Sequence, residues 1–299
     1  MKILCLGHAT YDITLPVDSF IHENNKYRVK EHLECGGGSA SNAAYLLGKW
    51  GMDVTFAGVV GNDEYGRFIK KELESVNVNT DYLELSQIYK TTSSFIVVNK
   101  TNGSRTILSY EQNEMKMQEL LLDFNPDVIL IDGQEYNMSA LVLEKYPNAI
   151  SIMDASHIND DVIELSKKVN YLICSKQFAE EISGIKINYN SPNTLKMLYF
   201  NLKQTFKNNI IVTLEEKGVL YEYNNILKIL PAMNVKPIDT TGAGDIFHGA
   251  FVYGIVNKMN YEEIIKLSNI ASGLSVTKLG SRNSIFSLEE VINVYEKIK

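Results

Sequence analysis

The chain has 299 residues, 45% of them hydrophobic, which fits one large α/β domain or one domain with a small appendage. Its formal net charge of -7 argues against a nucleic-acid partner, because such partners are held by lysine and arginine on phosphates. No run of about 18 apolar residues could span a bilayer, and the first twelve residues lack the apolar core of a signal peptide, so we expect a cytoplasmic protein with no membrane partner.

Short β-branched runs alternate with helical patterns through most of the chain. We expect buried strands at 3–7, 54–61, 127–133, 150–154, 171–175 and 210–214. Amphipathic stretches predict helices at 39–50, 64–75 and 160–168. This alternation predicts a parallel sheet between two layers of helices, with ligands bound beyond the carboxyl ends of the strands.

Two regions, about 12–35 and 90–110, break this alternation. The first is polar without a helical period, and the second contains two apolar strands joined around Asn102-Gly103, a strong hairpin signal. We expect the two regions to form a small antiparallel sheet that acts as a lid on the main sheet. The exposed apolar run FIVV at 95–98 also predicts a homodimer through the lid. A second hairpin is predicted around Asn224-Asn225.

The three cysteines, Cys5, Cys35 and Cys174, are odd in number and show no CxxC spacing. This pattern predicts neither a disulfide framework nor a structural zinc site. Cys5 and Cys174 lie within apolar runs, so we expect buried free thiols. The five histidines show no metal-ligand spacing either.

The stretch PIDTTGAGDIFHGAF at 237–251 places Gly242-Ala243-Gly244-Asp245 where a predicted helix begins. Free N–H groups and the helix dipole favour an anion there, and glycines allow a phosphate to come close. Asp245 beside a phosphate would accept a proton from an attacking hydroxyl, while an ordinary N-cap is the alternative role. The stretch matches neither a Walker loop, which needs a Lys, nor GxGxxG, because Phe247 replaces the third Gly.

A second glycine-rich stretch, ECGGGSASNAAYLLGKWG at 34–51, also leads into a predicted helix. Gly37 and Gly38 would let backbone groups touch a polyol directly. Asn42 could both donate to and accept from a hydroxyl. A flexible loop capped by Ser39 is the alternative.

Together, GGGSASNAA at 36–44 and DTTGAGD at 239–245 resemble the two signatures of the PfkB (ribokinase-like) carbohydrate kinases. GNDEYG at 61–66 and VTLEEKG at 212–218 extend the resemblance along the chain. It implies a single ribokinase-like kinase domain over 1–299. The implied fold class is a three-layer α/β/α sandwich with a mainly parallel central sheet and a small β-sheet lid.

The resemblance also implies roles for individual residues. Asp245 matches the catalytic base that activates the acceptor hydroxyl. The anion hole for the transferring phosphoryl group matches Gly242, Ala243 and Gly244. Positions that bind sugar hydroxyls match Asp12, Gly37, Gly38 and Asn42.

The cofactor side is implied in the same way, with Mg-ATP as the expected partner beside the sugar. Nucleotide-site positions match Ser175, Thr213, Gly218, Asn269 and Gly273, together with the loop near Gly280. Members of the family often hold a potassium ion where this chain has Asp239 and Ser284.

The chain departs from the family pattern after the strand at 171–175. Many members carry N-x-x-E there, with a Glu that orders water around magnesium, but this chain has Ser175 and Phe178. Glu180 and Glu181 are out of register, so no magnesium-ordering residue carries over. Glu215 likewise stands where a Gly is usual.

Four further residues have two readings each. Arg105 in the hairpin would reach a hydroxyl, carboxylate or sulfonate of the substrate, or else be a solvated strand arginine. Glu135 follows a strand and is a candidate substrate ligand, with an exposed loop Glu as the alternative. Asp154 either borders the nucleotide phosphates or forms a turn. His248 is expected to pack near the site rather than act in catalysis.

The combined pattern predicts an ATP-dependent sugar kinase, a phosphotransferase acting on a primary hydroxyl. The SKQFA and DGQE patterns at 175–179 and 132–135 resemble ketohexokinase and the sulfofructose-kinase-type sugar kinases, which favours a ketose or related hexose. One alternative is a nucleoside kinase on the same scaffold, which predicts a more aromatic substrate side, with Tyr11 and Tyr110 as the candidate residues. The other is a non-catalytic sugar-binding regulator, which would have no need of Asp245.

Overall fold

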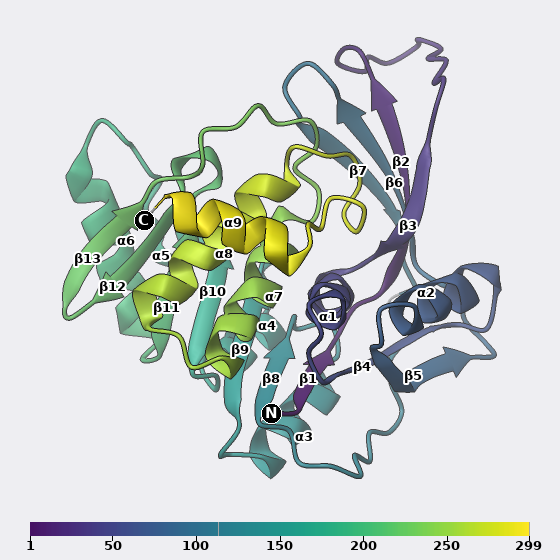
Figure 1. Ribbon diagram of the computed structural model, residues 1–299, viewed down its shortest axis with the longest axis horizontal. Coiled ribbons are helices and arrows are strands. Elements are labelled where there is room, and N and C mark those ends of the chain that lie inside the picture. The colour runs from purple at the N-terminus through teal and green to yellow at the C-terminus, as the bar shows by residue number, and fades with distance from the viewer. Residues whose placement is uncertain (113, 299) are drawn as a thin grey trace.

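A nine-stranded sheet forms the centre of the computed structural model, which describes residues 1–112 and 114–298 (Figure 1). Its strand order is β13-β12-β11-β10-β9-β8-β1-β4-β5. The strands are β1 (Ile3–Leu6), β4 (Val54–Gly61), β5 (Asn79–Ser86), β8 (Val128–Ile131), β9 (Ile150–Ala155), β10 (Tyr171–Ser175), β11 (Asn209–Thr213), β12 (Val219–Tyr223) and β13 (Ile226–Leu230). Pairing is parallel from β11 to β5 and antiparallel through β12 and β13.

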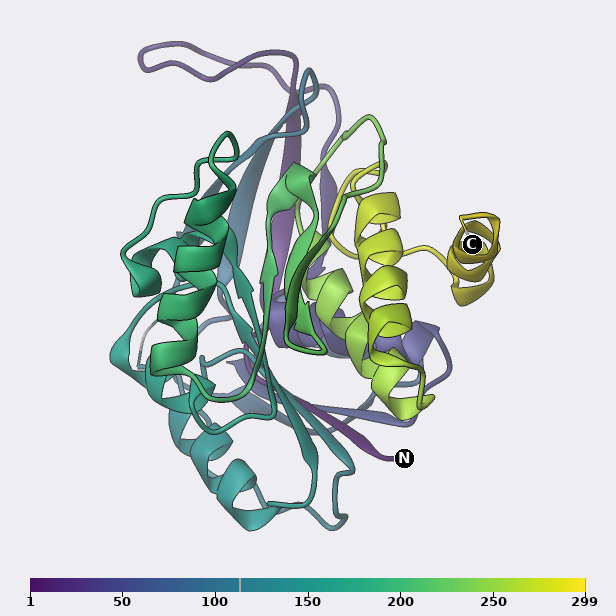
Figure 2. The same ribbon diagram turned by 90° about the vertical axis from the view of Figure 1, so that its left-hand side faces the viewer.

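Helices cover both faces of this sheet, as Figure 2 shows. One layer contains α1 (Ser39–Lys49), α2 (Glu64–Glu74), α7 (Ala243–Val256), α8 (Tyr261–Ser275) and α9 (Leu288–Lys297). The other contains α3 (Tyr136–Lys145), α4 (Asp160–Ser166), α5 (Lys176–Ser183) and α6 (Pro192–Thr205). Because side chains alternate along a strand, Ile3 and Cys5 pack in the first core and Leu4 and Leu6 in the second. The expected three-layer α/β/α fold class is confirmed.

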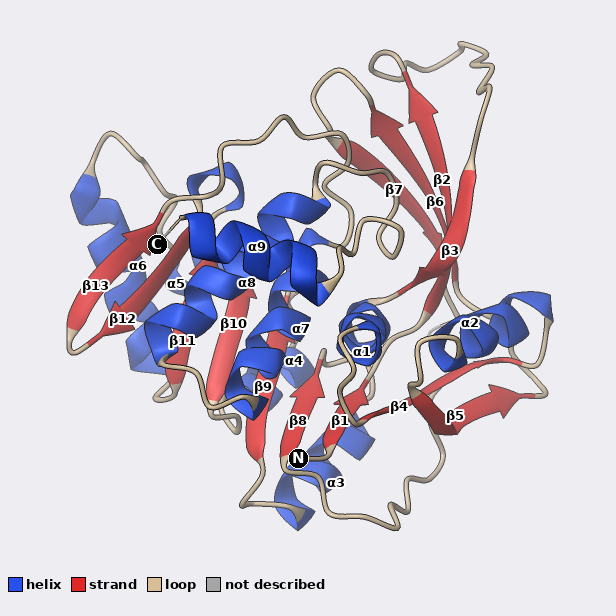
Figure 3. Cartoon of the chain, in the orientation of Figure 1, coloured by secondary structure: helices blue, strands red, loops and turns tan. Residues whose placement is uncertain are grey.

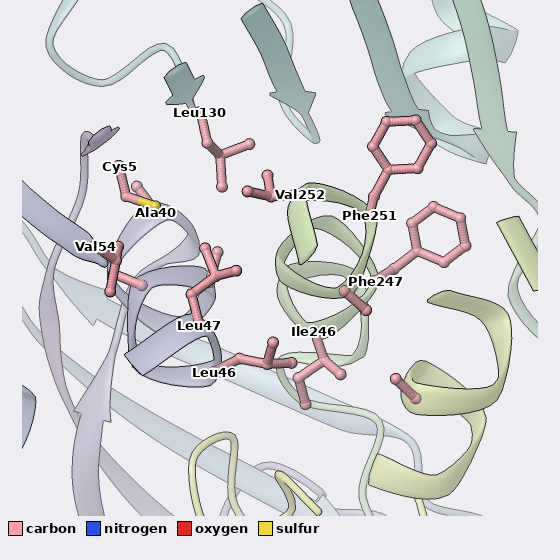
Figure 4. Packing of buried hydrophobic residues seen from close by; sticks show 14 of the residues in the cluster. Cys5, Ala40, Leu46, Leu47, Val54, Leu130, Ile246, Phe247, Phe251 and Val252 are labelled. Atoms are coloured by element: carbon pink, nitrogen blue, oxygen red, sulfur yellow. The ribbon is translucent and has the colours of Figure 1, made fainter. Parts of the chain in front are cut away.

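The two helices that follow the glycine-rich stretches pack against each other above the sheet. Figure 4 shows Leu46 and Leu47 of α1 and Ile246 of α7 in the core between them. Gly249 of α7 lies so close to α1 that an added Cβ would be 3.2 Å from the carbonyl oxygen of Ala43. This close packing brings the first turns of both helices to the carboxyl edge of the sheet.

A separate four-stranded sheet in the order β3-β2-β6-β7 projects beyond that edge (Figure 3). Its strands are β2 (Thr10–Val17), β3 (Leu33–Gly37), β6 (Ser93–Asn99) and β7 (Arg105–Tyr110). The expectation of an antiparallel sheet was wrong at one pair, because β2 and β6 run parallel. β2 follows β1 and β6 follows β5 in the chain, and β1 and β5 run in the same direction in the main sheet. Both strands therefore leave the main sheet in the same direction.

The local predictions mostly match the structure. Asn224 and Asn225 have φ values of 51° and 62°, as a two-residue hairpin turn requires, and Gly103 has a φ of 72°. Cys5 and Cys174 are buried and free, as expected, and Cys35 is buried and free as well. The edge strand β5 was not predicted, because its polar, partly exposed residues lack a continuous apolar run. Within the described residues, no helix combines the length and apolar character needed to cross a membrane.

Candidate active site

The first turn of α7 presents an open backbone at the carboxyl edge of the sheet. Gly242 is the N-cap residue, and its φ of 75° lies in the left-handed region that glycine favours. Gly244 is exposed, with nothing within 4 Å of an added Cβ among the described atoms. Asp245 therefore lies inside the first turn and is not the N-cap. The N-terminus of a helix favours an anion, and the N–H of Ala243 makes only a long bond of 3.5 Å to the carbonyl oxygen of Thr240.

Asp245 is held by the glycine-rich stretch of the other helix. Asn42 Nδ2 of α1 donates a hydrogen bond of 2.7 Å to Asp245 Oδ2. Burial raises the pKa of Asp245, while the bond from Asn42 acts to lower it. A carboxylate of this kind can accept a proton from a group that approaches the open turn.

Asp12 of β2 lies beside the same carboxyl group. It is 5% exposed and accepts a hydrogen bond of 2.7 Å from Thr10 Oγ1. Burial raises the pKa of Asp12 to about 6, and the nearby charge of Asp245 adds to the rise. An added Cβ on Gly37 would clash with the Asp12 carboxylate. Gly38 has a φ of 92°, and an added Cβ there would clash with the carbonyl oxygen of His8. Glycine is therefore required at both positions, and the structure brings this part of the predicted sugar side together.

A buried arginine, Arg282, completes this cluster and was not predicted from the sequence. Its Nε donates to Asn42 Oδ1 at 3.2 Å, and its Nη1 lies 2.5 Å from Glu72 Oε2 of α2. An arginine in the loop stretch SRNS resembles a solvated side chain, and no local pattern indicates its burial.

His248 and Asp154 form a buried pair under the first turn of α7. His248 Nδ1 lies 3.3 Å from Asp154 Oδ2 and 2.6 Å from the carbonyl oxygen of Gly244. Burial raises the pKa of Asp154 to about 7, and the imidazole of His248 opposes this rise. His248 thus packs beneath the site, as expected, and Asp154 connects the end of β9 to α7.

Arg105 and Glu135 occupy different places around the site. Arg105 is exposed, and its Nη1 donates to Thr240 Oγ1 at 2.7 Å, which joins the small sheet to the turn before α7. Glu135 is 6% exposed and accepts a hydrogen bond of 3.0 Å from Met117 N, so it is not an exposed loop residue. Burial raises the pKa of Glu135 to about 7, and its side chain lines a small polar pocket with Thr92.

The departure after β10 has a structural explanation. Ser175 Oγ accepts a hydrogen bond of 3.1 Å from Phe178 N and caps α5. The Phe178 side chain is fully buried in the core, so it does not face the site. Glu180 accepts a hydrogen bond from Ile187 N and lies 3.1 Å from Lys186 Nζ. Its carboxylate is therefore bound by residues that follow α5 in the chain.

The other predicted nucleotide-site residues lie around the ends of β11 and α8. Thr213 pairs with Ser175 in the sheet register, at the carboxyl ends of their strands. Gly218 has a φ of 100°, and an added Cβ would clash with the carbonyl oxygen of Leu230. Asn269 Nδ2 donates to the carbonyl oxygen of Pro231 at 2.8 Å, and Gly273 packs on Met233. Both α8 residues thus face the segment that leads to the first turn of α7.

Asp239 and Ser284 both bond to Gly280, through its N–H and its carbonyl oxygen respectively. Asp239 accepts from Thr241 N at 2.9 Å and from Gly280 N at 2.8 Å, and Ser284 Oγ donates to the carbonyl oxygen of Ser281. In the described part of the chain, Thr241 Oγ1 is buried without a hydrogen-bond partner. Oxygen donors suit hard cations, so the residues present fit a potassium ion. The described residues contain no group of three or more metal-ligating acids, histidines or cysteines, and magnesium commonly binds through substrate phosphates and water.

The two tyrosines predicted for a nucleoside site do not gather over Asp12. Tyr11 stacks on Tyr65 with ring centroids 4.0 Å apart, and its hydroxyl donates to Glu34 Oε2 at 2.7 Å. Neighbouring residues of a strand point to opposite faces, so Tyr11 faces away from the side of β2 that carries Asp12. Tyr110 is 54% exposed at the end of β7.

Comparison with known proteins decides the family. The family model described as pfkB family carbohydrate kinase matches residues 1–287. The chain belongs to this family. It is 28% identical to ribokinase from Staphylococcus aureus, over 98% of this chain and 99% of that protein. It is 22% identical to nucleoside kinase from Methanocaldococcus jannaschii, over 99% and 97% of the two chains.

Solved structures agree with this assignment at the level of the fold. Ribokinase from Cryptococcus neoformans in complex with ADP matches with a TM-score of 0.83 and 23% identity, over 98% of this chain and 99% of that one. This pfkB-family kinase is therefore a phosphotransferase with an alcohol group as acceptor, and kinases of its family use ATP. The expected class of enzyme is confirmed.

The raised pKa of Asp12 predicts a stability that depends on pH. The folded protein binds this proton more tightly than the unfolded chain, whose ordinary value is 3.8, so stability falls as pH rises toward the folded value of about 6. The Asp12→Asn variant has no carboxyl group to ionise at this position, so its stability does not fall for this reason as pH rises. We expect the variant to gain about 1–3 kcal/mol in free energy of unfolding over wild type between about pH 4 and about pH 7, measured by urea unfolding.

Asp18→Asn is the matched control just beyond β2. The bond from Lys100 Nζ lowers the pKa of Asp18, so any pH effect should have the opposite sign. Parallel stability profiles for Asp12→Asn and wild type would contradict the prediction.

Proposed function

We propose that this kinase transfers the γ-phosphoryl group of ATP to a primary hydroxyl of a ketose or related hexose. The main observation behind the proposal is the position of the Asp245 carboxylate beside the open first turn of α7. Asn42 Nδ2 fixes this carboxylate by a hydrogen bond of 2.7 Å to Oδ2. A base next to a backbone anion site is the arrangement that phosphoryl transfer to a hydroxyl needs. The polar surroundings of Asp12 suit a polyol, and the SKQFA and DGQE patterns favour a ketose.

In this mechanism each group of residues has one task. ATP would supply the phosphoryl group, and the magnesium ion bound to ATP would neutralise much of the charge on that group. Asp245 accepts the proton of the attacking hydroxyl, and the N–H groups of 242–244 stabilise charge on the transferring group. Asn42 opposes the rise in the pKa of Asp245 that burial causes, because it donates to the carboxylate. Asp12 and the backbone of Gly37 and Gly38 orient the sugar hydroxyls.

The remaining assignments extend the proposal around the site. The small sheet acts as a lid over a single kinase domain, with Arg105 and Glu135 as further substrate contacts, and its closure excludes water. The nucleotide lies along the ends of β10, β11 and α8, against Ser175, Thr213, Gly218, Asn269 and Gly273. Asp239 and Ser284 would hold a potassium ion.

A nucleoside kinase is the second candidate, supported by the similarity to the nucleoside kinase from Methanocaldococcus jannaschii. The placement of Tyr11 against Tyr65 weighs for the sugar, because it leaves that ring engaged away from Asp12. The membership of the kinase family weighs against a non-catalytic regulator.

A substrate panel tests the proposed function. ADP release from ATP is measured with ketohexoses, aldohexoses, ribose and nucleosides, with and without magnesium and potassium. We expect a ketohexose or a close relative to give the highest kcat/KM. Turnover restricted to nucleosides would favour the second candidate, and no turnover on any acceptor would contradict kinase activity on these classes.

Asp245→Asn tests the proposed base directly. The variant keeps the shape and loses the proton acceptor, so kcat should fall by about 10²–10⁴-fold. Asp160→Asn, an exposed acid in the first turn of α4, is the control and should keep wild-type kcat. Both variants should fold normally, and Asp245→Asn should unfold at or above the wild-type temperature, because burial raises the pKa of the carboxyl group that it removes. Near wild-type turnover by Asp245→Asn would remove Asp245 from this role.

The outer face of the small sheet supports a homodimer. Phe95 and Leu108 are cross-strand partners on β6 and β7, and they are 44% and 60% exposed. We expect light scattering at micromolar concentration to give the mass of a dimer. Leu108→Lys should shift it to a monomer, and a monomeric wild type would contradict the assembly.

A further inference from the structure

Behind the proposed base lies a buried arginine for which the mechanism above has no task. Arg282, in the loop between α8 and α9, is 1% exposed and is the largest of the fully buried side chains in the described chain. A guanidinium has five N–H donors, no acceptor, and a permanent charge. Its burial therefore requires acceptors from several directions, and these come from two helices.

The first acceptor connects Arg282 to the proposed base. Arg282 Nε donates to Asn42 Oδ1 at 3.2 Å, and Asn42 Nδ2 donates to Asp245 Oδ2 at 2.7 Å. A donor-only group on one side and an acceptor-only carboxylate on the other leave the amide one favourable orientation. Turned over, Asn42 would set N–H against N–H and oxygen against oxygen, and both contacts would repel.

The other acceptors hold the guanidinium itself. Arg282 Nη1 lies 2.5 Å from Glu72 Oε2 of α2, and Nη2 donates to Ser41 Oγ of α1. Glu72 Oε2 also accepts from Gly36 N at 2.7 Å. An added Cβ on Gly36 would fall 2.2 Å from Arg282 Nη1, so the glycine-rich stretch passes directly over the guanidinium. The Arg282 side chain is thus held by Glu72 and Ser41 in addition to Asn42.

We propose that Arg282 is a positioning residue for phosphoryl transfer, which acts through Asn42 by holding the amide in the orientation that donates to Asp245. The inference rests on the function proposed above. Without the guanidinium, Asn42 Oδ1 loses its donor, so the amide is held on one side only and can rotate out of the geometry that donates to Asp245. The carboxylate would then lose its donor and move away from the attacking hydroxyl.

A double-mutant cycle between Arg282 and Asn42 tests this on the best acceptor found for wild type. Arg282→Met should lower kcat by about 10- to 100-fold, the scale of a misplaced reacting group, and leave KM for ATP within about two-fold. In the Asn42→Ala background the same substitution should change kcat by less than about two-fold, because the residue through which it acts is gone. Arg67→Met, at an exposed α2 arginine that contacts Asn62, is the control and should keep wild-type kcat.

Equal losses in both backgrounds, or a folded Arg282→Met enzyme with wild-type kcat, would overturn the inference. If Arg282→Met unfolds at the assay temperature, Arg282→Lys replaces it in the cycle, because it keeps a charge for Glu72 but lacks the Nε–H that faces Asn42. The same two results overturn the inference for this variant. A wild-type protein without kinase activity would overturn the proposed function and this inference together, whereas additive losses in an active enzyme overturn this inference alone.

Discussion

The hydrogen bond from Asn42 to Asp245 is the contact on which the rest of the site depends. It joins residues 203 positions apart, at the beginnings of α1 and α7. A bond of 2.7 Å is possible only because the two helices pack along each other, with Gly249 against Ala43, and begin at the same edge of the sheet. That edge lies beside β1, where the chain continues to β4 on one side and β8 on the other, as expected for a ligand crevice in an open α/β sheet.

Buried charge is the second constraint at this edge. Burial raises the pKa values of Asp12, Asp154 and Asp245, so each ionised form needs a local partner. Arg282 opposes the rise at Asp12, His248 at Asp154, and Asn42 at Asp245. Several carboxyl groups with perturbed pKa values gathered at one edge of a sheet are typical of an active site.

The small sheet turns one face toward the turn before α7, and its other face packs on α2 at Tyr11 and is exposed at Phe95 and Leu108. Register places Asp12 and Arg105 on the face that meets the turn before α7, and Phe95 and Leu108 on the opposite face. The parallel pairing of β2 with β6 makes this possible, because both strands leave the main sheet in the same direction. A substrate contact and an assembly surface can therefore lie on two sides of the same four strands.

Local patterns were sufficient for the layers of the fold, for both hairpins and for the two glycine-rich helix starts. Each of these depends on residues close in sequence: alternation along a strand, helical spacing, or a backbone turn such as Asn224-Asn225. The parallel β2–β6 pairing, the Phe178 side chain in the core and the Arg282 cluster were not predictable in this way. Arg282 meets Asn42 and Glu72 across 240 and 210 positions of the chain. A charged side chain is buried only where distant elements supply its acceptors, and that is decided by how α1, α2 and the loop before α9 pack together.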